Sequence, residues 1–216
     1  MATVTWGRSP SSAWRALAQL PRRSVTFSAH EGPRLGRDGW AVDHYCQPLP
    51  SEAPGPPVPG GSWAIARAVI RDYEFADPRL TEAHYRSDEP LVGRDMLLVG
   101  RFYGLRFHMG VRVSGVVDDE LLVDGRPARV WGWHYDTLEG HLEAGRMGFE
   151  AWKWTDTGEV EFRMRRTVRP GRIRNPIVRL GLWVFGRWMQ ERFVRRACDR
   201  MVEIVRIAQR ISRQDP

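Results

Sequence analysis

The chain has 216 residues, of which 42% are hydrophobic, and its formal net charge is +7. This length and composition fit one domain of ordinary size with a substantial core, and they argue against intrinsic disorder. Lys153 is the only lysine, so nearly all the positive charge comes from arginine. An arginine surplus can indicate an anionic partner or simply a GC-rich genome. No block of consecutive basic residues is present, so no nucleic-acid partner is expected.

The two cysteines, Cys46 and Cys198, lie far apart, and no CxxC or zinc-ligand spacing occurs. We therefore expect free thiols in a reducing compartment, no metal and no cofactor. The first residues lack the apolar run of a signal peptide, and no window holds about 18 uninterrupted apolar residues. These features predict a soluble cytoplasmic protein, and they leave its oligomeric state open.

The first part of the chain combines a short helix with a connector rich in proline. Ser11 or Ser12 can cap a helix that ends at Pro21. Residues 48–61 hold six prolines and three glycines, a composition that favours extended backbone and excludes a helix or a central strand. We expect residues 1–61 to form an N-terminal arm with a Pro/Gly-rich connector, packed on a domain that spans residues 62–213.

The domain opens with helical spacing and continues as a series of strands. Ser62 is a suitable N-cap for a helix over residues 62–75, and residues 76–87 suggest a second short helix. Several later segments alternate apolar and polar residues with period two, which is typical of half-buried strands. The sequence thus predicts an antiparallel meander, whose strands would lie at about 93–102, 105–113, 116–123, 129–137, 146–154 and 160–168.

A long helix follows the strands. Asn175 and Pro176 supply an N-cap and a first helical residue, and the pattern continues to about Ile211. An α+β helix-grip fold is therefore expected, in which a curved antiparallel sheet surrounds the long C-terminal helix and a cavity lies between them. The apolar stripe of this helix comprises Leu182, Phe185, Met189, Phe193, Ala197, Met201, Ile204, Ala208 and Ile211.

The segment from Trp131 to Trp154 has the densest cluster of groups able to perform chemistry, and it contains four of the ten tryptophans. His141 and Glu143 lie between two glycines, where they could orient a ligand or move a proton, or could simply stabilise a loop. The catalytic candidates are His141, Glu143 and Tyr135. The predicted ligand-binding residues are Trp131, Trp133, Tyr135, Thr137, His141, Glu143, Phe107, Met109, Met189 and Phe193.

Other patterns are less informative. The His-x-Glu pair lacks the Pro-Cys-x-x-Cys of zinc deaminases, and nothing fixes the spacing of His108 and His134, so no metal site is predicted. No phosphate-binding glycine loop or nucleophile elbow is present. Arg101, Arg106 and Arg112 alternate with apolar residues and could face solvent or an anionic head group.

Several segments resemble a known family. FADPRL, VWGWHYDTLEGHLEAGRMGFEAWKW and NPIVRLGLWVFGRWMQERF are similar to the family called domain of unknown function nineteen-ninety, found largely in actinobacteria, over roughly residues 48–205. The sharpest match is Y-x-T-L-x-G-H-x-E-x-G, which begins at Tyr135. Many members carry Gly, Pro and Glu where this chain has Asp136, Leu142 and the pair Arg146–Met147, which weakens an acid–base role here. The resemblance implies the START and birch-pollen-allergen superfamily, hence a helix-grip fold and apolar ligands, and it implies no particular reaction.

Three classes of function remain. The first is a binding protein for an apolar or amphipathic small molecule in the cavity between sheet and helix. The second is an enzyme that uses His141, Glu143 and Tyr135 in the same cavity. The third is a protein that docks on a membrane or a nucleic acid through its arginines, and peripheral membrane contact is the more acceptable form of it.

Overall fold

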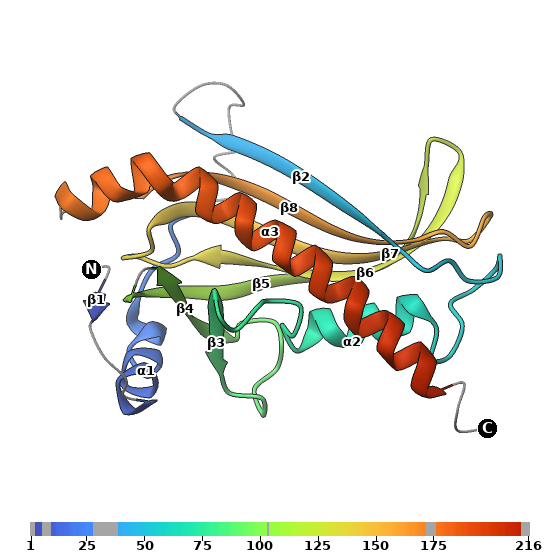
Figure 1. Ribbon diagram of the computed structural model, residues 1–216, viewed down its shortest axis with the longest axis horizontal. Coiled ribbons are helices and arrows are strands. Elements are labelled where there is room, and N and C mark those ends of the chain that lie inside the picture. The colour runs from blue at the N-terminus through green and yellow to red at the C-terminus, as the bar shows by residue number, and fades with distance from the viewer. Residues whose placement is uncertain (1–2, 6–9, 28–38, 103, 172–175, 213–216) are drawn as a thin grey trace.

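The computed structural model describes residues 3–5, 10–27, 39–102, 104–171 and 176–212 (Figure 1). The helices are α1 (Pro10–Leu17), the 3-10 turn η1 (Leu20–Arg22), α2 (Ser62–Arg71) and α3 (Pro176–Ser212). The strands are β1 (Thr3–Thr5), β2 (Ala41–Leu49), β3 (Thr81–Tyr85), β4 (Asp95–Phe102), β5 (Leu105–Val123), β6 (Arg126–Thr137), β7 (Glu143–Trp154) and β8 (Val160–Pro170).

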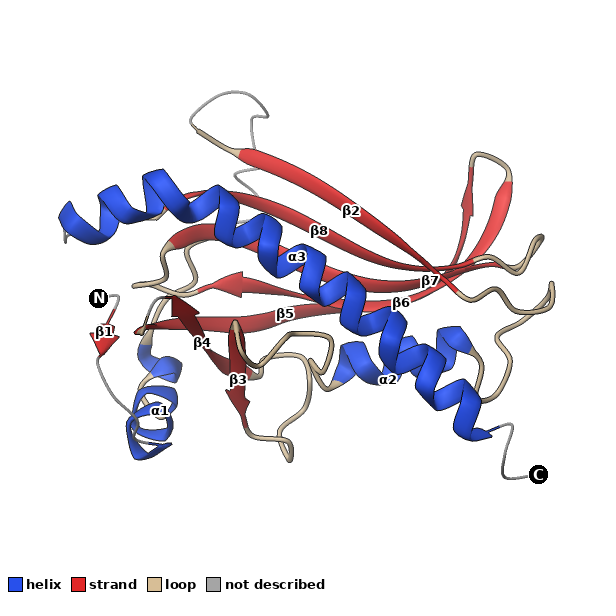
Figure 2. Ribbon diagram, in the orientation of Figure 1, coloured by secondary structure: helices blue, strands red, loops and turns tan. Residues whose placement is uncertain are grey.

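One antiparallel sheet holds all of these strands. Its order is β2-β8-β7-β6-β5-β4-β3, and β1 pairs with β5 beside that path. Strands β3 to β8 follow one another as a meander, whereas β2 joins at the far edge through nine residue pairs with β8. The sheet curves and α3 lies diagonally across one of its faces (Figure 2). The predicted helix-grip fold is confirmed.

The C-terminal half of α3 is packed against the core. Val194, Ala197, Met201 and Val205 are buried at successive steps of three or four residues, as an amphipathic helix requires. The predicted apolar stripe was too long, because Phe185 is 45% exposed in the N-terminal half. The predicted N-cap Asn175 lies outside the described residues. None of the described helices is long and apolar enough to cross a membrane.

Helix α2 fills the space between the sheet and the C-terminal half of α3. Two indole groups fix its position: Trp63 Nε1 donates to the Ala151 carbonyl at 3.1 Å, and Trp133 Nε1 donates to the Ile70 carbonyl at 2.9 Å. Both rings are buried, and each indole N–H has a backbone carbonyl as its acceptor. This end of the space between helix and sheet is therefore closed.

The opposite face of the sheet is covered by smaller groups. Leu20 of η1 is fully buried there above Gly110, where an added Cβ would lie only 2.6 Å from Leu20 Cδ2. Trp152 and Trp154 face the same side, and the Arg163 guanidinium lies 4.0 Å from the centroid of the Trp152 ring. Arginine side chains thus shield aromatic surface that no helix covers.

A buried ion pair fixes the proline-rich connector. Lys153 has no exposed surface, and its Nζ lies 2.6 Å from Glu52 Oε2 and 2.9 Å from the Pro56 carbonyl oxygen. The other carboxylate oxygen of Glu52 accepts the N–H of Trp63 at 2.8 Å. The connector, strand β7 and the start of α2 therefore meet at one carboxylate. The division into an arm and a domain stays a prediction, but the sheet draws strands from both sides of residue 61.

Some local expectations were wrong. Residues 81–85, placed in a short helix, form edge strand β3, and the two strands expected at 105–113 and 116–123 are one strand, β5, with a register shift near Gly115. The N-cap of α2 is Gly61 rather than Ser62, which is buried and accepts a hydrogen bond from Gln209. In each case a tertiary contact outweighs the local propensity.

Lys153→Ala should destabilise the protein by roughly 3–5 kcal/mol, because it leaves the Glu52 carboxylate buried without its cation. Urea denaturation measures this loss. The control is Arg187→Ala, which removes an exposed partner of Glu191 and should cost no more than about 1 kcal/mol. The double variant Lys153→Met with Glu52→Gln should recover part of the loss. If Lys153→Ala and Arg187→Ala lost the same amount of stability, the buried ion pair of Lys153 and Glu52 would not stabilise the fold.

Candidate functional site

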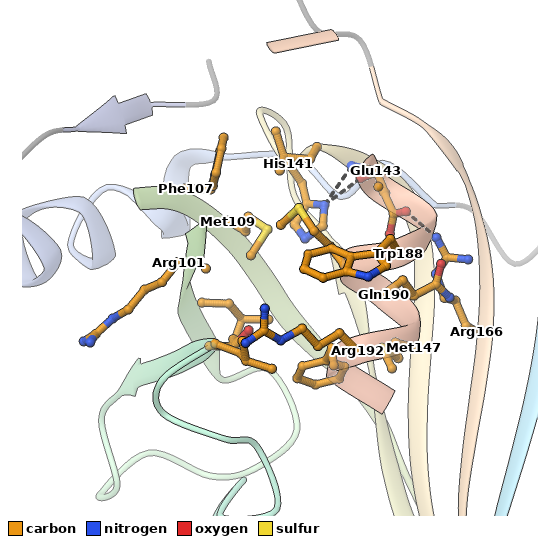
Figure 3. Close-up of a pocket in the computed structure, with 18 of the residues that line it drawn as sticks. Arg101, Phe107, Met109, His141, Glu143, Met147, Arg166, Trp188, Gln190 and Arg192 are labelled. Atoms are coloured by element: carbon orange, nitrogen blue, oxygen red, sulfur yellow. Dashed lines mark hydrogen bonds and ion pairs between the residues drawn. The ribbon is translucent and has the colours of Figure 1, made fainter. Parts of the chain in front are cut away.

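A cavity of about 500 Å³ lies between the N-terminal half of α3 and the curved sheet (Figure 3). Strands β4 and β5 form one wall, the connection between β6 and β7 forms another, and α3 covers them. The cavity is lined by Tyr73, Arg79, Leu80, Thr81, Leu98, Gly100, Arg101, Gly104, Phe107, Met109, Tyr135, His141, Leu142, Glu143, Met147, Arg166, Gly186, Trp188, Met189, Gln190, Arg192 and Phe193.

Most of the predicted ligand-binding residues come together here. Tyr135, His141, Glu143, Phe107, Met109, Met189 and Phe193 line the cavity. Trp131 and Trp133 do not, although they alternate with Tyr135 on the same face of β6. They lie further along the strand, beneath α2, where the Arg67 guanidinium is 5.2 Å from the centroid of the Trp131 ring. Contact of any of these residues with a ligand stays a prediction.

Thr137, the third predicted residue outside the cavity, organises the connection between β6 and β7. Its hydroxyl accepts the N–H of Gly145 at 2.9 Å, and its carbonyl accepts the N–H of Thr26 at 2.8 Å. Gly140 and Gly145 have φ values of 88° and 156°, and a Cβ at Gly145 would lie 2.1 Å from the Thr167 carbonyl oxygen. These glycines allow the connection to turn back tightly and place His141 and Glu143 at the cavity.

His141 is held by the backbone of Glu143. Its Nδ1 lies 2.9 Å from both the amide nitrogen and the carbonyl oxygen of Glu143, so either ring tautomer has a backbone partner. Burial lowers the pKa of His141 to about 4, the Arg166 charge acts in the same direction, and the hydrogen bond to Glu143 opposes both. The ring is therefore neutral at pH 7, and the residue lines the cavity.

The carboxylate of Glu143 forms an ion pair with Arg166 instead of contacting His141. Arg166 is only 8% exposed, and its other terminal nitrogen lies 2.7 Å from Asp43 Oδ2. Gln190 of α3 also donates to this Asp43 oxygen, at 3.3 Å. This network connects β7, β8, β2 and α3 at one end of the cavity. Sequence reasoning missed Arg166, because its partners lie on other strands and leave no local signal.

Two buried tyrosines lie deeper in the cavity. The Tyr135 hydroxyl donates to the sulfur of Met147 at 3.5 Å, and burial, followed by the Glu143 charge, raises its pKa. Burial also raises the pKa of Tyr73, whose hydroxyl interacts with that of Tyr135. Both hydroxyls are therefore protonated at neutral pH.

Tyr73 was absent from the sequence-based candidates. It has a φ of 60°, in the left-handed region that glycine usually occupies after a helix, and the next N–H, that of Glu74, bonds to the Val69 carbonyl at 2.9 Å. Its ring packs on Phe149, with 5.6 Å between centroids. The strain, roughly 1 kcal/mol, is offset by this packing. A tyrosine just after a helix gives no sequence signal of this role.

The candidate metal ligands do not form a site. In the part of the chain that the structure describes, no group of three or more His, Cys, Asp or Glu side chains is arranged to hold a metal ion. His108 and His134 lie on neighbouring strands, and burial lowers the pKa of both.

The fold and the cavity define a helix-grip protein with a space between its sheet and its long helix. The family model "Domain of unknown function (DUF1990)" matches residues 23–200, and the chain belongs to this family. No curated protein matches the sequence.

The chain is also similar to solved structures. They include Ara h 8.0201, with a TM-score of 0.45 and 11% identity over 77% of this chain and 98% of that one. Norcoclaurine synthase from Thalictrum flavum, in complex with dopamine and hydroxybenzaldehyde, has a TM-score of 0.43 and 8% identity over 95% and 96%. Hypothetical protein jhp0584 from Helicobacter pylori has a TM-score of 0.43 and 11% identity over 83% and 95%. Scores and identities this low say nothing about what the chain binds.

Asp136 and Arg146 form a pair on the sheet. Asp136 and Arg146 are paired across β6 and β7, and their side chains form a two-point ion pair at 2.7 and 3.0 Å. Asp136 is buried, so its carboxylate needs this cation. Arg146 therefore balances the charge of Asp136 on the sheet, and neither residue belongs to the cavity lining.

His141→Gln should flatten the dependence of stability on pH. The pKa of His141 is about 4 when folded and near 6.5 when unfolded, so its contribution is complete above pH 6.5 and is lost as the pH falls towards 4. Urea denaturation at about pH 7.5 and about pH 5 should show a larger loss for the wild type than for the variant. Parallel losses would mean that the histidine titrates with its ordinary pKa.

Proposed function

We propose that this protein binds an apolar or amphipathic small molecule in the cavity between its sheet and α3. The observation that supports this function most is the lining: Leu98, Phe107, Met109 and Phe193 present apolar surface around a space of about 500 Å³. Pockets for single small molecules have this size, and they combine apolar walls with a few polar groups. His141 and the two tyrosine hydroxyls supply such groups.

An enzyme that uses the same cavity has less support. Acid–base catalysis needs groups that exchange protons near neutral pH and reach one another or the substrate. The carboxylate of Glu143 is bound to Arg166, the lowered pKa of His141 keeps its ring neutral, and the raised pKa of Tyr135 keeps its hydroxyl protonated. These three candidates suit the orientation of a ligand better than the transfer of a proton.

Docking through arginines of the sheet also has less support. Arg101 pairs with Glu82, and Arg112 pairs with Asp95 at 2.7 Å. Arginines that already have carboxylate partners give up those ion pairs when they bind an anionic surface. A membrane contact by other parts of the surface remains a hypothesis.

A neutral fluorescent probe, N-phenyl-1-naphthylamine, tests the proposal. Its emission should rise when it enters the cavity of the wild-type protein, and the rise should saturate near one probe per chain. Met109→Trp should reduce the affinity at least about tenfold, because the larger ring fills space that the probe needs. Met109 is a suitable position because its Cε already lies over Gly100, 3.0 Å from where a Cβ would be.

The matched control is Leu122→Trp, which adds the same ring at the end of the β5–β6 hairpin, where Leu122 is 75% exposed. It should leave the affinity for the probe unchanged. If both variants bind the probe as the wild type does, the cavity is not the binding site. If Met109→Trp alone weakens the binding of the probe, native mass spectrometry of protein purified from its own host should identify the natural ligand.

A further inference from the structure

The cavity has a marked imbalance of charge. Four arginines line it (Arg79, Arg101, Arg166 and Arg192), and Glu143 is its only acidic lining residue among those that the structure describes. This excess of arginines does not suit a wholly apolar ligand, because an unpaired cation beside such a ligand loses hydration without compensation.

Two of these arginines are already neutralised. Arg166 is bound by Asp43 and Glu143 on two sides, and Arg101 pairs with Glu82. In Figure 3 the Arg101 side chain points away from the cavity. These two therefore have no free charge for a ligand.

Arg79 and Arg192 differ from them. Within the described ranges, neither guanidinium forms an ion pair with a carboxylate, and both residues are exposed. Asp77, two residues before Arg79, uses a carboxylate oxygen to accept the backbone N–H of Arg79 at 2.9 Å. The cavity therefore has, among the described residues, two guanidinium groups without an ion-pair partner at its solvent-exposed boundary.

The guanidinium of Arg192 is held in place by an aromatic ring. Its guanidinium lies 5.3 Å from the centroid of the Trp188 ring, and its side chain extends from α3 across the cavity in Figure 3. Contact with an aromatic face leaves the N–H groups at the edge of the guanidinium available, and these match the two oxygens of a carboxylate or phosphate. Charge-assisted pairs of this kind are among the stronger hydrogen bonds.

We propose that the ligand is an amphipathic anion, with its carboxylate or phosphate at Arg79 and Arg192 and its apolar part among Leu98, Phe107 and Met109. This inference rests on the proposed function, since the apolar part occupies the same cavity. About 500 Å³ accommodates one compact or single-chain molecule, so the class is that of single-chain acids and monophosphate esters.

Displacement of N-phenyl-1-naphthylamine separates the roles of head and tail. At about pH 8, where dodecanoate is ionised, dodecanoate should displace the probe at a concentration roughly tenfold lower than dodecanol. Dodecyl phosphate distinguishes the two head groups, because the better competitor identifies the preferred anion. Inorganic phosphate, which has no tail, should not displace the probe.

Arg192→Gln and Arg79→Gln should each lower the affinity for dodecanoate by roughly three- to tenfold and leave the affinity for dodecanol unchanged. Arg187→Gln is the matched control: it lies on the same helix, is 88% exposed and is paired with Glu191, so neither competitor should be affected. Equal displacement by acid and alcohol, with no effect of the variants, would overturn the anionic head group and leave cavity binding intact. If the probe itself fails to bind, the proposed function fails as well.

Discussion

The architecture depends on how a long helix can contact a curved sheet. Helix α3 has 37 residues, about 55 Å, and its C-terminal half carries a continuous line of buried residues from Val194 to Val205. There α2 lies between helix and sheet and closes the space, with Trp63 and Trp133 bonded to the backbone on either side. Among the described residues, no helix lies between the sheet and the N-terminal half of α3, where Trp188 is 46% exposed. The cavity is a result of this uneven filling.

The polar groups at the cavity follow from the need to compensate one buried arginine. Arg166 lies on β8 and is only 8% exposed, and a guanidinium buried to this extent needs carboxylates as partners. Asp43 and Glu143 meet this requirement, and Gln190 extends the network to α3. The role of Glu143 is thus decided by its partner and not by its neighbour in the sequence. Interactions between strands set the character of the site more than the local motif does.

The sequence was sufficient where periodicity reports burial directly. The strands from β5 to β8 and the long helix follow from alternation and from steps of three and four residues, and the glycines around His141 indicated a tight connection at the cavity. The sequence was insufficient where contacts with residues distant in the chain determine the local structure. Residues 81–85 pair with β4 despite their helical composition, and the edge strand β2 contains Pro48, which argued for a connector. Trp131 and Trp133 face the concave side as expected, but α2 occupies it there.

The single lysine gives the molecule an unusual chemical property. An ε-amino group with no exposed surface, bonded to Glu52 and Pro56, is closed to acylating reagents and to proteases that cleave after lysine while the connector stays in place. Reaction at Lys153 would therefore occur only in chains in which the connector has separated from β7 and α2. The rate of that reaction therefore measures how often the connector opens, and no other lysine side chain competes for the reagent.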